Sequence, residues 1–569
     1  MTAVLFLLAL VSTLGQVNPQ RHPGGGYRIA GVVVDAVTAA PVPQAQVSIV
    51  VRSEEMSVVA SDQGRFALEG IEAGKYAISA AAQGYVREAY NQHGPYSTAI
   101  VTGDGQDSEH LVFRLHPQAL IYGRVTDERG EAVRGAQVQL FVLERSRGIR
   151  AKFVRAQTQT NDLGEYRFPH LLPGKYYLAV QARPWYAETQ VFVRRQFDGQ
   201  TGQNDGSSDL ATGDGGSFSI SEPKADFDPL LDVVYPTTFY PSVTDERSST
   251  ELVLGAGEKQ EANITLQAVP ATRVRLTGLP ADGGSSIGIG ASQKVFGTPS
   301  FGFGVTSGQI APGEFEVAGL PPGDVTLVLT TNRGNESTSR TIDIHSRAGT
   351  LDASRLQSTA RVSGRVFDPE GGPETNEGFV SLISSSTPDQ PVATPTQLQK
   401  DGTFSFPEVQ TGTYRIEVNL NVGGYFAQKV SAKEAIVSGR EITITGGNDV
   451  DVTVTMAQGQ GRVSGVVQLD GKPLAGVMVL LVPESGQEIE EDSRMDQSDS
   501  DGTFNLGGIH PGNYVLLAIQ DGWELEWAKP GVLKPYLEAG QKVSIAPNQP
   551  IKLTVDAQEK TVTTEKKPQ

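Results

Sequence analysis

The sequence of 569 residues contains no cysteine. A chain without cysteine has no disulfide framework, no lipid attached through a lipobox cysteine and no thiolate for nucleophilic catalysis. Any stable domain in it must therefore be held together by a packed hydrophobic core.

Long apolar runs are also scarce, and the one that stands out lies at the start of the chain. Residues 4–11 are apolar and precede the small residues Ser12, Thr13 and Gly15, as in a secretory signal peptide, although the usual basic residues are missing. As a membrane anchor the run is too short, because a helix needs about 20 apolar residues to cross the hydrocarbon core. We predict that residues 1–15 are a signal peptide cleaved near Gly15, and that no later segment spans a membrane. The mature chain is then exported to the periplasm, the cell surface or the medium.

Basic residues are outnumbered, since 47 Lys and Arg against 65 Asp and Glu give a net charge of −18. This charge repels phosphate backbones and anionic lipids, so nucleic acid is not an expected partner. The 64 glycines and 33 prolines favour short strands and turns over long helices. The length allows four or five modules of roughly 100 residues each.

One sequence pattern returns along most of the chain and predicts the fold. It opens with a Gly-x-Val strand, which is followed by a second apolar strand. The Gly-x-Val strand occurs at Gly31–Val33, Gly123–Val125, Gly364–Val366 and Gly465–Val467.

The second half of the repeat is a tight turn with Asp and Gly, an aromatic residue and a Gly-x-Tyr strand. Asp and Gly favour the backbone of tight turns, and the alternating large residues give a hairpin with one buried face. A degenerate fifth copy, without the acidic residue, has Gly313, Phe315, Gly323 and Val325. The four complete copies are Asp62, Gly64, Phe66 and Tyr76; Asp162, Gly164, Tyr166 and Tyr176; Asp401, Gly402, Phe404 and Tyr414; and Asp501, Gly502, Phe504 and Tyr514.

These hairpins predict an all-β chain, a tandem array of about five small antiparallel β-sandwich modules of the transthyretin-like or immunoglobulin-like kind. A rod is the simplest arrangement of such an array. Residues 196–228 inside the second module and the tail 558–569 are polar and are expected to be disordered. The module boundaries are predicted at 27–116, 117–269, 270–357, 358–457 and 460–557, of which the third is the most divergent.

The combination of Gly-x-Val, Asp-x-x-Gly-x-aromatic and Gly-x-Tyr in this order resembles the carboxypeptidase regulatory-like domain family. The resemblance extends over most of the chain. It implies tandem copies of a transthyretin-like sandwich, also described as a carbohydrate-binding-like fold. The family is named after a domain attached to zinc carboxypeptidases, and the resemblance implies this accessory module and not the protease. In exported proteins such arrays look like adhesive, scaffold or glycan-contacting segments.

Residue patterns for catalysis are missing. None of the seven histidines lies in an HExxH arrangement, and no Gly-x-Ser-x-Gly elbow occurs. His170 and His510 occupy matching places in two hairpins and are interpreted as surface residues. The acidic run Asp496, Asp499 and Asp501 lacks the register of a calcium loop and is interpreted as an ordinary acidic turn. We expect no catalytic residue, no metal site and no cofactor.

Aromatic residues follow the Gly-x-Tyr strand at comparable places in several modules. They are the best candidates for contact with a sugar ring, while the structural alternative is that they cap the open ends of the sandwiches. The candidates are Tyr85, Trp185, Tyr186, Tyr425, Trp523 and Trp527.

We therefore expect a non-catalytic protein that acts in binding, adhesion or as a spacer or scaffold at the cell envelope. The alternatives are a carbohydrate-binding protein that uses the loop aromatics and an accessory subunit of a secreted hydrolase or envelope complex. Polysaccharide and envelope proteins are the expected partners.

Overall fold

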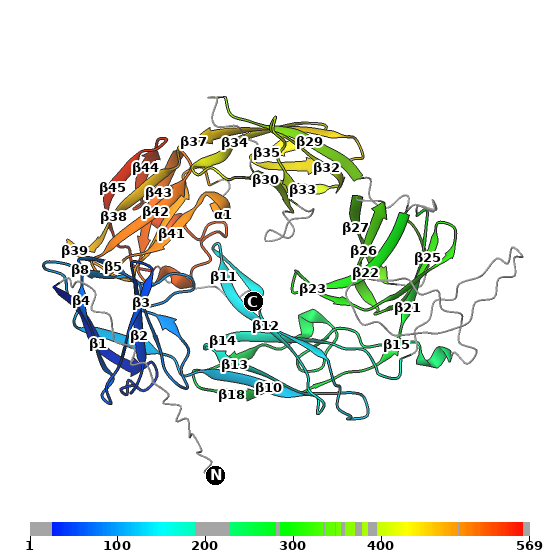
Figure 1. Cartoon of the computed structure of the whole chain (residues 1–569), viewed down its shortest axis with the longest axis horizontal. Helices are drawn as coiled ribbons and strands as arrows, with labels where there is room; N and C mark the ends of the chain where they lie inside the picture. Colours follow the sequence, from blue (N-terminus) through cyan, green and yellow to red (C-terminus); the bar gives the residue numbers. More distant parts are fainter. Residues whose placement is uncertain are drawn as a thin grey trace, which may run out of the picture.

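The computed structural model describes residues 26–187, 228–279, 285–333, 336–346, 349–353, 359–369, 378–384, 395–486 and 489–560. The predicted signal peptide lies outside these ranges. So do the predicted loop, except for Asp228, and the predicted tail, except for residues 558–560. Within the described ranges the strands form five sandwich modules (Figure 1), so the predicted all-β array is confirmed.

Module 1 (residues 27–115) has two sheets that enclose one core. Their strand orders are β4-β1-β9 and β3-β2-β6-β7, and β5 pairs with β8 beside them. The strands are β1 Tyr27–Asp35, β2 Gln46–Val51, β3 Glu54–Val59, β4 Arg65–Ile71, β5 Gly74–Tyr76, β6 Ile78–Ala81, β7 Glu88–Ala89, β8 Ile100–Thr102 and β9 Leu111–Leu115.

Module 2 (residues 119–270) repeats this plan with sheets β13-β10-β18 and β12-β11-β14-β16. In addition β19 pairs with β10, β17 with β14 and β15 with β20. The elements are β10 Ala119–Thr126, β11 Gln137–Ser146, β12 Ile149–Gln159, β13 Glu165–Leu171, β14 Gly174–Gln181, η1 Pro229–Leu231, β15 Val233–Val234, β16 Thr238–Phe239, η2 Glu246–Ser248, β17 Leu252–Leu254, β18 Lys259–Glu261, β19 Ile264–Thr265 and β20 Val269–Pro270.

Module 3 (residues 272–352) contains the sheets β24-β25-β21-β28 and β23-β22-β26-β27, and module 4 (residues 359–458) contains β32-β29-β37-β34 and β31-β30-β33-β36-β35. The strands are β21 Thr272–Thr277, β22 Ser285–Val295, β23 Thr298–Phe303, β24 Thr306–Ala311, β25 Glu314–Leu320, β26 Gly323–Arg333, β27 Glu336–Ser346, β28 Gly349–Asp352, β29 Thr359–Phe367, β30 Gly378–Ser384, β31 Thr396–Gln397, β32 Thr403–Gln410, β33 Gly412–Leu420, β34 Tyr425–Lys433, β35 Ile436–Ser438, β36 Glu441–Ile444 and β37 Val450–Gln458.

Module 5 (residues 461–558) contains the sheets β39-β38-β42, with β45 also on β38, and β41-β40-β43-β44. Gln558, assigned above to the tail, is bonded to β43, because its N–H donates to the carbonyl of Ala518 at 2.8 Å. The elements are β38 Gly461–Leu469, β39 Lys472–Pro473, β40 Met478–Pro483, α1 Ile489–Asp492, β41 Arg494–Gln497, β42 Thr503–Ile509, β43 Gly512–Ile519, η3 Gly522–Glu524, α2 Lys534–Leu537, β44 Gln541–Ile545 and β45 Pro550–Asp556.

In each module the first strand runs parallel to a strand near the end of the module, which adds one feature to the antiparallel sandwich predicted from the hairpins. These pairs are β1 with β9, β10 with β18 and β19, β21 with β28, β29 with β37, and β38 with β45. A parallel pair cannot be closed by a short turn, so the intervening strands of the module form the crossover. The parallel pair joins the two ends of a module's chain within one sheet.

The glycine of the Gly-x-Val motif lies where this parallel partner passes closest. A Cβ at Gly465 would stand 2.0 Å from the carbonyl oxygen of Leu553, and a Cβ at Gly123 would stand 2.1 Å from that of Ala262. Across the antiparallel pair, Gly465 faces the repeated aromatic Phe504. The ring therefore packs over a position that must have no side chain, and this explains why the two motifs recur together.

The other two motif residues are fixed by hydrogen bonds to the backbone. The turn glycine Gly502 has φ +77°, and its carbonyl accepts the N–H of Val467 from the Gly-x-Val strand at 2.8 Å. The Tyr514 hydroxyl donates to the carbonyl of His510, four residues earlier, at 2.9 Å. The same tyrosine bond occurs at Tyr76, Tyr176 and Tyr414 and resembles the tyrosine corner of immunoglobulin-like sandwiches.

The modules follow one another around a closed ring, in which module 5 lies against module 1 (Figure 1), and this corrects the expected rod. Chain neighbours also contact each other. Phe296 of module 3 lies 5.0 Å from the Phe141 ring of module 2, and Gln410 of module 4 donates to the carbonyl of Thr341 at 2.6 Å. Among the described residues, no helix is long and apolar enough to cross a membrane.

A substitution of the motif glycine should destabilise its module. For Gly465→Ala we expect a loss of about 1–3 kcal/mol in the free energy of unfolding, because the new methyl group overlaps a backbone carbonyl. The measurement is urea unfolding followed by tryptophan fluorescence, since Trp523 and Trp527 report on module 5. Gly507→Ala is the matched control in the same module, because nothing lies within 4 Å of its added Cβ. Equal midpoints for the two variants would refute the steric explanation.

Candidate functional site

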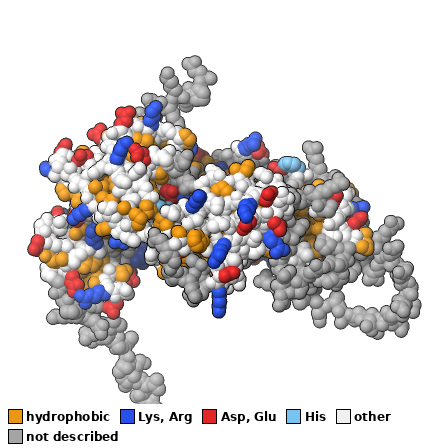
Figure 2. Space-filling model, turned by 90° about the horizontal axis from the view of Figure 1, so that it is seen from above, with side chains coloured by type: hydrophobic (Ala, Val, Ile, Leu, Met, Phe, Trp, Pro, Cys, Tyr) orange, Lys and Arg blue, Asp and Glu red, His pale blue; other side chains and the backbone are white. Residues whose placement is uncertain are grey.

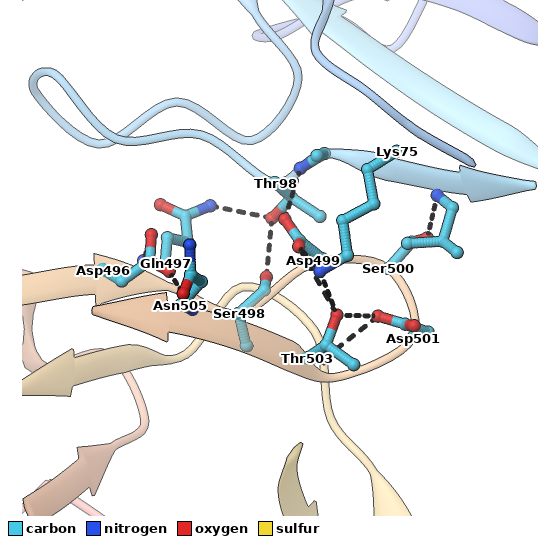
Figure 3. A network of polar contacts seen from close by, with 12 residues as sticks. Lys75, Thr98, Asp496, Gln497, Ser498, Asp499, Ser500, Asp501, Thr503 and Asn505 are labelled. Atoms are coloured by element: carbon cyan, nitrogen blue, oxygen red, sulfur yellow. Dashed lines mark hydrogen bonds and ion pairs between the residues drawn. The ribbon is translucent and has the colours of Figure 1, made fainter. Parts of the chain in front are cut away.

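The ring is closed by hydrogen bonds between the backbone at the start of β8 in module 1 and the loop that follows β41 of module 5 (Figure 3). The N–H of Ser500 donates to the carbonyl of Ala99 at 2.9 Å. In return, the N–H of Ala99 donates to Oδ1 of Asp499 at 3.1 Å, and the N–H of Val101 donates to Oγ of Ser500 at 2.8 Å. The loop therefore binds the exposed edge of module 1 as a partner strand would.

A charged pair and a buried amide complete this contact. Lys75 Nζ lies 2.5 Å from Oδ2 of Asp499, whose side chain is only 15% exposed. Gln497 is 1% exposed, and its Nε2 donates to the hydroxyl of Thr98 at 2.8 Å and to the carbonyl of Asn91 at 2.7 Å. Because both hydrogens of this amide have acceptors on module 1, the glutamine is buried in the closed ring without an unpaired donor.

The acidic run of the sequence lies at this closure. Asp499 binds module 1, while Asp496 Oδ2 accepts the N–H of Asn505 and Asp501 Oδ1 accepts that of Thr503. Burial raises the pKa of Asp496. In the part of the chain that the structure describes, no three His, Asp or Glu side chains are grouped so that they could hold a metal ion.

The loop after β43 carries Trp523 and Trp527, which were two of the candidates for contact with a sugar ring. Trp523 stacks on His93 of module 1, with ring centroids 4.6 Å apart and planes 7° apart. Trp527 is 5% exposed and covers the outer face of β40 and β43. Both rings are therefore engaged in packing, and Trp527 has no open face for a ligand in this structure.

The tip of the β11–β12 hairpin of module 2 reaches the same loop. Gly148 has φ +78°, and an added Cβ there would lie 2.4 Å from the Trp527 ring. The N–H of Ala528 donates to the Gly148 carbonyl at 3.2 Å, and Arg145 forms a 2.5 Å ion pair with Glu524. The loop of module 5 thus holds both modules 1 and 2.

The remaining candidate aromatics lie in different surroundings. The Tyr85 hydroxyl donates to Asp35 at 3.0 Å near the junction of modules 1 and 2. Trp185 is 86% exposed and packs edge-on against Tyr186, which donates to Glu128. The Tyr186 pKa is raised to about 12 by burial and by this hydrogen bond. Of these residues, Trp185 presents the most open ring.

Tyr425 lies in a cleft between modules 4 and 5 that the hairpin of module 2 also reaches. The cleft has a volume of about 450 Å³. Its lining includes Tyr425, His510 and four arginines, namely Arg147 of module 2, Arg415 and Arg440 of module 4, and Arg494 of module 5.

Arg415, Arg440 and Arg494 are partly buried and are held in place by hydrogen bonds and ion pairs, whereas Arg147 is exposed. Arg440 pairs with Asp492 at 2.7 Å, and Arg494 Nη2 donates to the carbonyl of Gly508 at 2.6 Å. Burial opposes ionisation of Asp492, but the hydrogen bond from His510 and the charge of Arg440 keep its pKa below the usual value. Burial also lowers the pKa of Arg494, whose guanidinium nevertheless stays charged at neutral pH.

Sequence reasoning missed this cleft, although one signal was available. The residue after Gly-x-Tyr is Ala77, Tyr177 or Val515 in three modules, whereas module 4 has Arg415 there. His510, interpreted above as a surface residue, is instead largely buried and stacks on Phe426 at 4.6 Å. The role of His510 depends on its contact with Phe426 of module 4, and a local sequence motif does not report such a contact between modules.

The comparison with protein families agrees with the fold. The carboxypeptidase regulatory-like domain family matches residues 28–116 and 121–205. No curated protein sequence matches the chain. Among solved structures, the Bacillus anthracis TIE protein is 12% identical with a TM-score of 0.14, and the match covers 90% of this chain and 66% of that one.

Pilins are also found among the similar structures. A streptococcal ancillary pilin is 13% identical with a TM-score of 0.18, over 57% of this chain and 98% of the pilin. The minor pilin GBS52 of Streptococcus agalactiae is 15% identical with a TM-score of 0.18, over 37% of this chain and 100% of the pilin. Matches with TM-scores this low carry no argument about this chain.

Asp499→Ala should open the ring, because it removes the charged partner of Lys75 and leaves the N–H of Ala99 without its acceptor. Since the chain has no cysteine, spin labels can be placed at Gln63→Cys and Lys552→Cys alone, and double electron–electron resonance then measures the distance between modules 1 and 5. We expect a longer and broader distance distribution for the variant.

Asp451→Ala, which breaks the exposed 3.7 Å pair with Lys433 inside module 4, is the control and should leave the distribution unchanged. An unchanged distribution for Asp499→Ala would show that this contact does not hold the ring closed.

Proposed function

Given that residues 28–116 and 121–205 match the carboxypeptidase regulatory-like domain family, we propose that the chain is a non-catalytic binding protein. In this proposal it acts outside the cytoplasm as a closed frame of sandwich modules. The observation that carries the proposal is the closure of module 5 onto modules 1 and 2. Export is inferred from the apolar start of the sequence, which precedes the described residues.

The closure supports a frame because it restricts motion that tandem modules usually have. Modules joined only by short linkers are expected to move relative to each other. Here Gln497 is buried between the two ends of the ring, and Trp527 packs on the hairpin of module 2. A binding surface spread over several modules then loses less conformational entropy when a partner binds, which strengthens binding.

Polysaccharide and envelope proteins are the partners we propose for this frame. Acidic and basic side chains are intermixed on the face shown in Figure 2, so this surface does not form a single charged patch. Such a surface suits a large, hydrated partner held by many weak contacts. An accessory subunit of a secreted hydrolase or envelope complex would use the same frame.

The frame proposal predicts that envelope binding depends on closure. Wild-type protein should co-sediment with an envelope fraction, and Asp499→Ala should bind about tenfold more weakly, which corresponds to about 1.4 kcal/mol. Asp451→Ala is again the control. Periodate treatment of the envelope removes polysaccharide partners, and protease treatment removes protein partners. The treatment that abolishes binding therefore identifies the class of partner.

No co-sedimentation of the wild type, or turnover of a peptide, ester or glycoside substrate by the pure chain, would contradict the proposal.

Trp185 supports a second candidate function, which is contact with glycans. Its ring is 86% exposed beside Tyr186, and sugar rings stack on open aromatic faces of this kind. Tyr186 is fixed by Glu128 and lies 5.8 Å from the guanidinium of Arg129, which makes the platform rigid.

Glycan contact through Trp185 predicts retardation of the wild type in native gels that contain the recognised polysaccharide. Trp185→Ala should migrate as in plain gels because the stacking surface is lost. Val253→Ala, which truncates another exposed apolar side chain of module 2, should remain retarded. Equal retardation of both variants would exclude Trp185 as the contact.

A further inference from the structure

A second cleft lies where modules 2 and 3 meet, beside their apolar contact. Phe141 on β11 and Ala179 on β14 belong to a cluster that packs on Val295 of module 3. Side chains alternate between the two faces of a strand, so Gln137 and Gln181 lie on the same face of these two strands. The two glutamines are cross-strand partners and line a cleft of about 210 Å³, the amide cleft.

The pair of glutamines is not part of the repeat. The same two positions are Gln46 and Ala81 in module 1, and Met478 and Ile519 in module 5. A structural role that all the sandwiches share therefore does not explain the two amides of module 2.

Hydrogen bonds orient one amide and leave polar atoms of both for a ligand. Gln181 Nε2 donates to the hydroxyl of Thr237 at 2.7 Å, and this hydroxyl donates to Oε1 of Gln293 in module 3 at 2.6 Å. Among the described residues, neither Gln181 Oε1 nor the side chain of Gln137 has a hydrogen-bond partner. Since an amide contains both donors and an acceptor, the cleft offers both kinds of group.

The rest of the lining adds backbone groups and no net charge. Gly302 and Gly304 of module 3 line the cleft, and an added Cβ at Gly304 would have no atom within 4 Å. Among the described lining residues, Arg183 is the one charged side chain. Glu128, which accepts the hydroxyl of the lining residue Tyr235 at 3.4 Å, carries the opposite charge. These surroundings favour a neutral ligand that both donates and accepts hydrogen bonds.

The size and place of the amide cleft favour a sugar over a peptide. At about 30 Å³ for each water molecule, its volume equals that of about seven waters, which suits one sugar ring with its hydroxyl groups. A peptide strand would need a free sheet edge, whereas β11 lies between β12 and β14. Only side chains of β11 are therefore open to a ligand.

We propose that the amide cleft binds one sugar ring of a neutral glycan. Gln137 and Gln181 bond the hydroxyl groups of this ring, which lies against the backbone at Gly304. The inference rests on the second candidate function above only for the class of ligand, because the residues that bind the ring are different.

Glu128 connects the amide cleft to the aromatic pair of that candidate function. Its carboxylate accepts the hydroxyl of Tyr186 as well as that of Tyr235. Tyr186 in turn packs edge-on against the exposed ring of Trp185. A glycan with one ring in the cleft therefore places its next sugars on the side of Trp185.

Calorimetric titration of the full chain tests the proposal with maltotriose, cellotriose, xylotriose and mannotriose. We expect at least one of these neutral trisaccharides to bind. The acidic trigalacturonate and the neutral tripeptide Ala-Gln-Ala should bind at least about tenfold more weakly, which corresponds to about 1.4 kcal/mol. The proposal is overturned if none of the four trisaccharides binds, if the tripeptide binds equally well, or if trigalacturonate binds more tightly.

Two glutamine variants locate the site. Gln137→Ala should weaken binding of the trisaccharide about three- to tenfold, as expected for one lost hydrogen bond. Gln159→Ala is the matched control, because Gln159 is the exposed partner of Gln137 on β12 and lies outside the cleft. It should leave the affinity unchanged.

A glycine variant tests the space in the cleft. Gly304→Leu puts a side chain where the protein leaves room, so the module should stay folded while the sugar is excluded. Gly446→Leu, at a loop glycine of module 4 that also has nothing within 4 Å of an added Cβ, should bind as the wild type does. Thermal unfolding checks that each variant is folded.

Unchanged affinity in both Gln137→Ala and Gly304→Leu would overturn the site. If Trp185→Ala abolishes retardation in polysaccharide gels while both cleft variants remain retarded, this inference fails and the contact through Trp185 stands. If the cleft variants lose the trisaccharide and Trp185→Ala remains retarded, the cleft stands and the contact through Trp185 fails.

Discussion

The close approach of the first and last strands in each module is the constraint on which the rest of the structure depends. At Gly465 the partner backbone is so near that no side chain fits, and Phe504 packs over the space that results. Because the parallel pair joins both ends of a module's chain, it fixes where the chain enters and leaves. The direction from each module to the next follows from this. Five such modules can then follow a curve on which the last meets the first.

The repeated residues build the modules, and the residues that differ between modules build the junctions. The position after Gly-x-Tyr shows this most clearly. Tyr177 takes part in the aromatic contact with Phe296 of module 3, Val515 lies under the Trp527 loop, and Arg415 lines the basic cleft. The same position in the repeat therefore carries a side chain that packs in two modules and a charged side chain in a third.

The sequence was sufficient for the modules because their signals are local. A turn glycine, a tyrosine bonded four residues back and an alternating strand can each be recognised within about ten residues. Module 3 was seen as divergent for the same reason, since Leu276 occupies the place opposite Phe315 where the other four modules have glycine. The ring escaped prediction because Lys75 and Asp499 are 424 residues apart and neither belongs to a motif of its own. For Trp523 and Trp527 the sequence left two interpretations open, because a loop aromatic has the same sequence signature whether it meets a ligand or another module.

The Asp-Gly turn of module 5 shows how a repeat unit acquires a new task without losing its first one. On its inner side the carbonyl of Gly502 accepts the N–H of Val467, as the equivalent turn does in other modules. On its outer side Asp499 and Ser500 bind the backbone of module 1. The turn in module 2 has Asn161 where module 5 has Asp499, and there the side chain bonds within its own turn. The two loops share a backbone conformation that the fold fixes. The side chains that point outward from this loop in module 5 are the ones that close the ring.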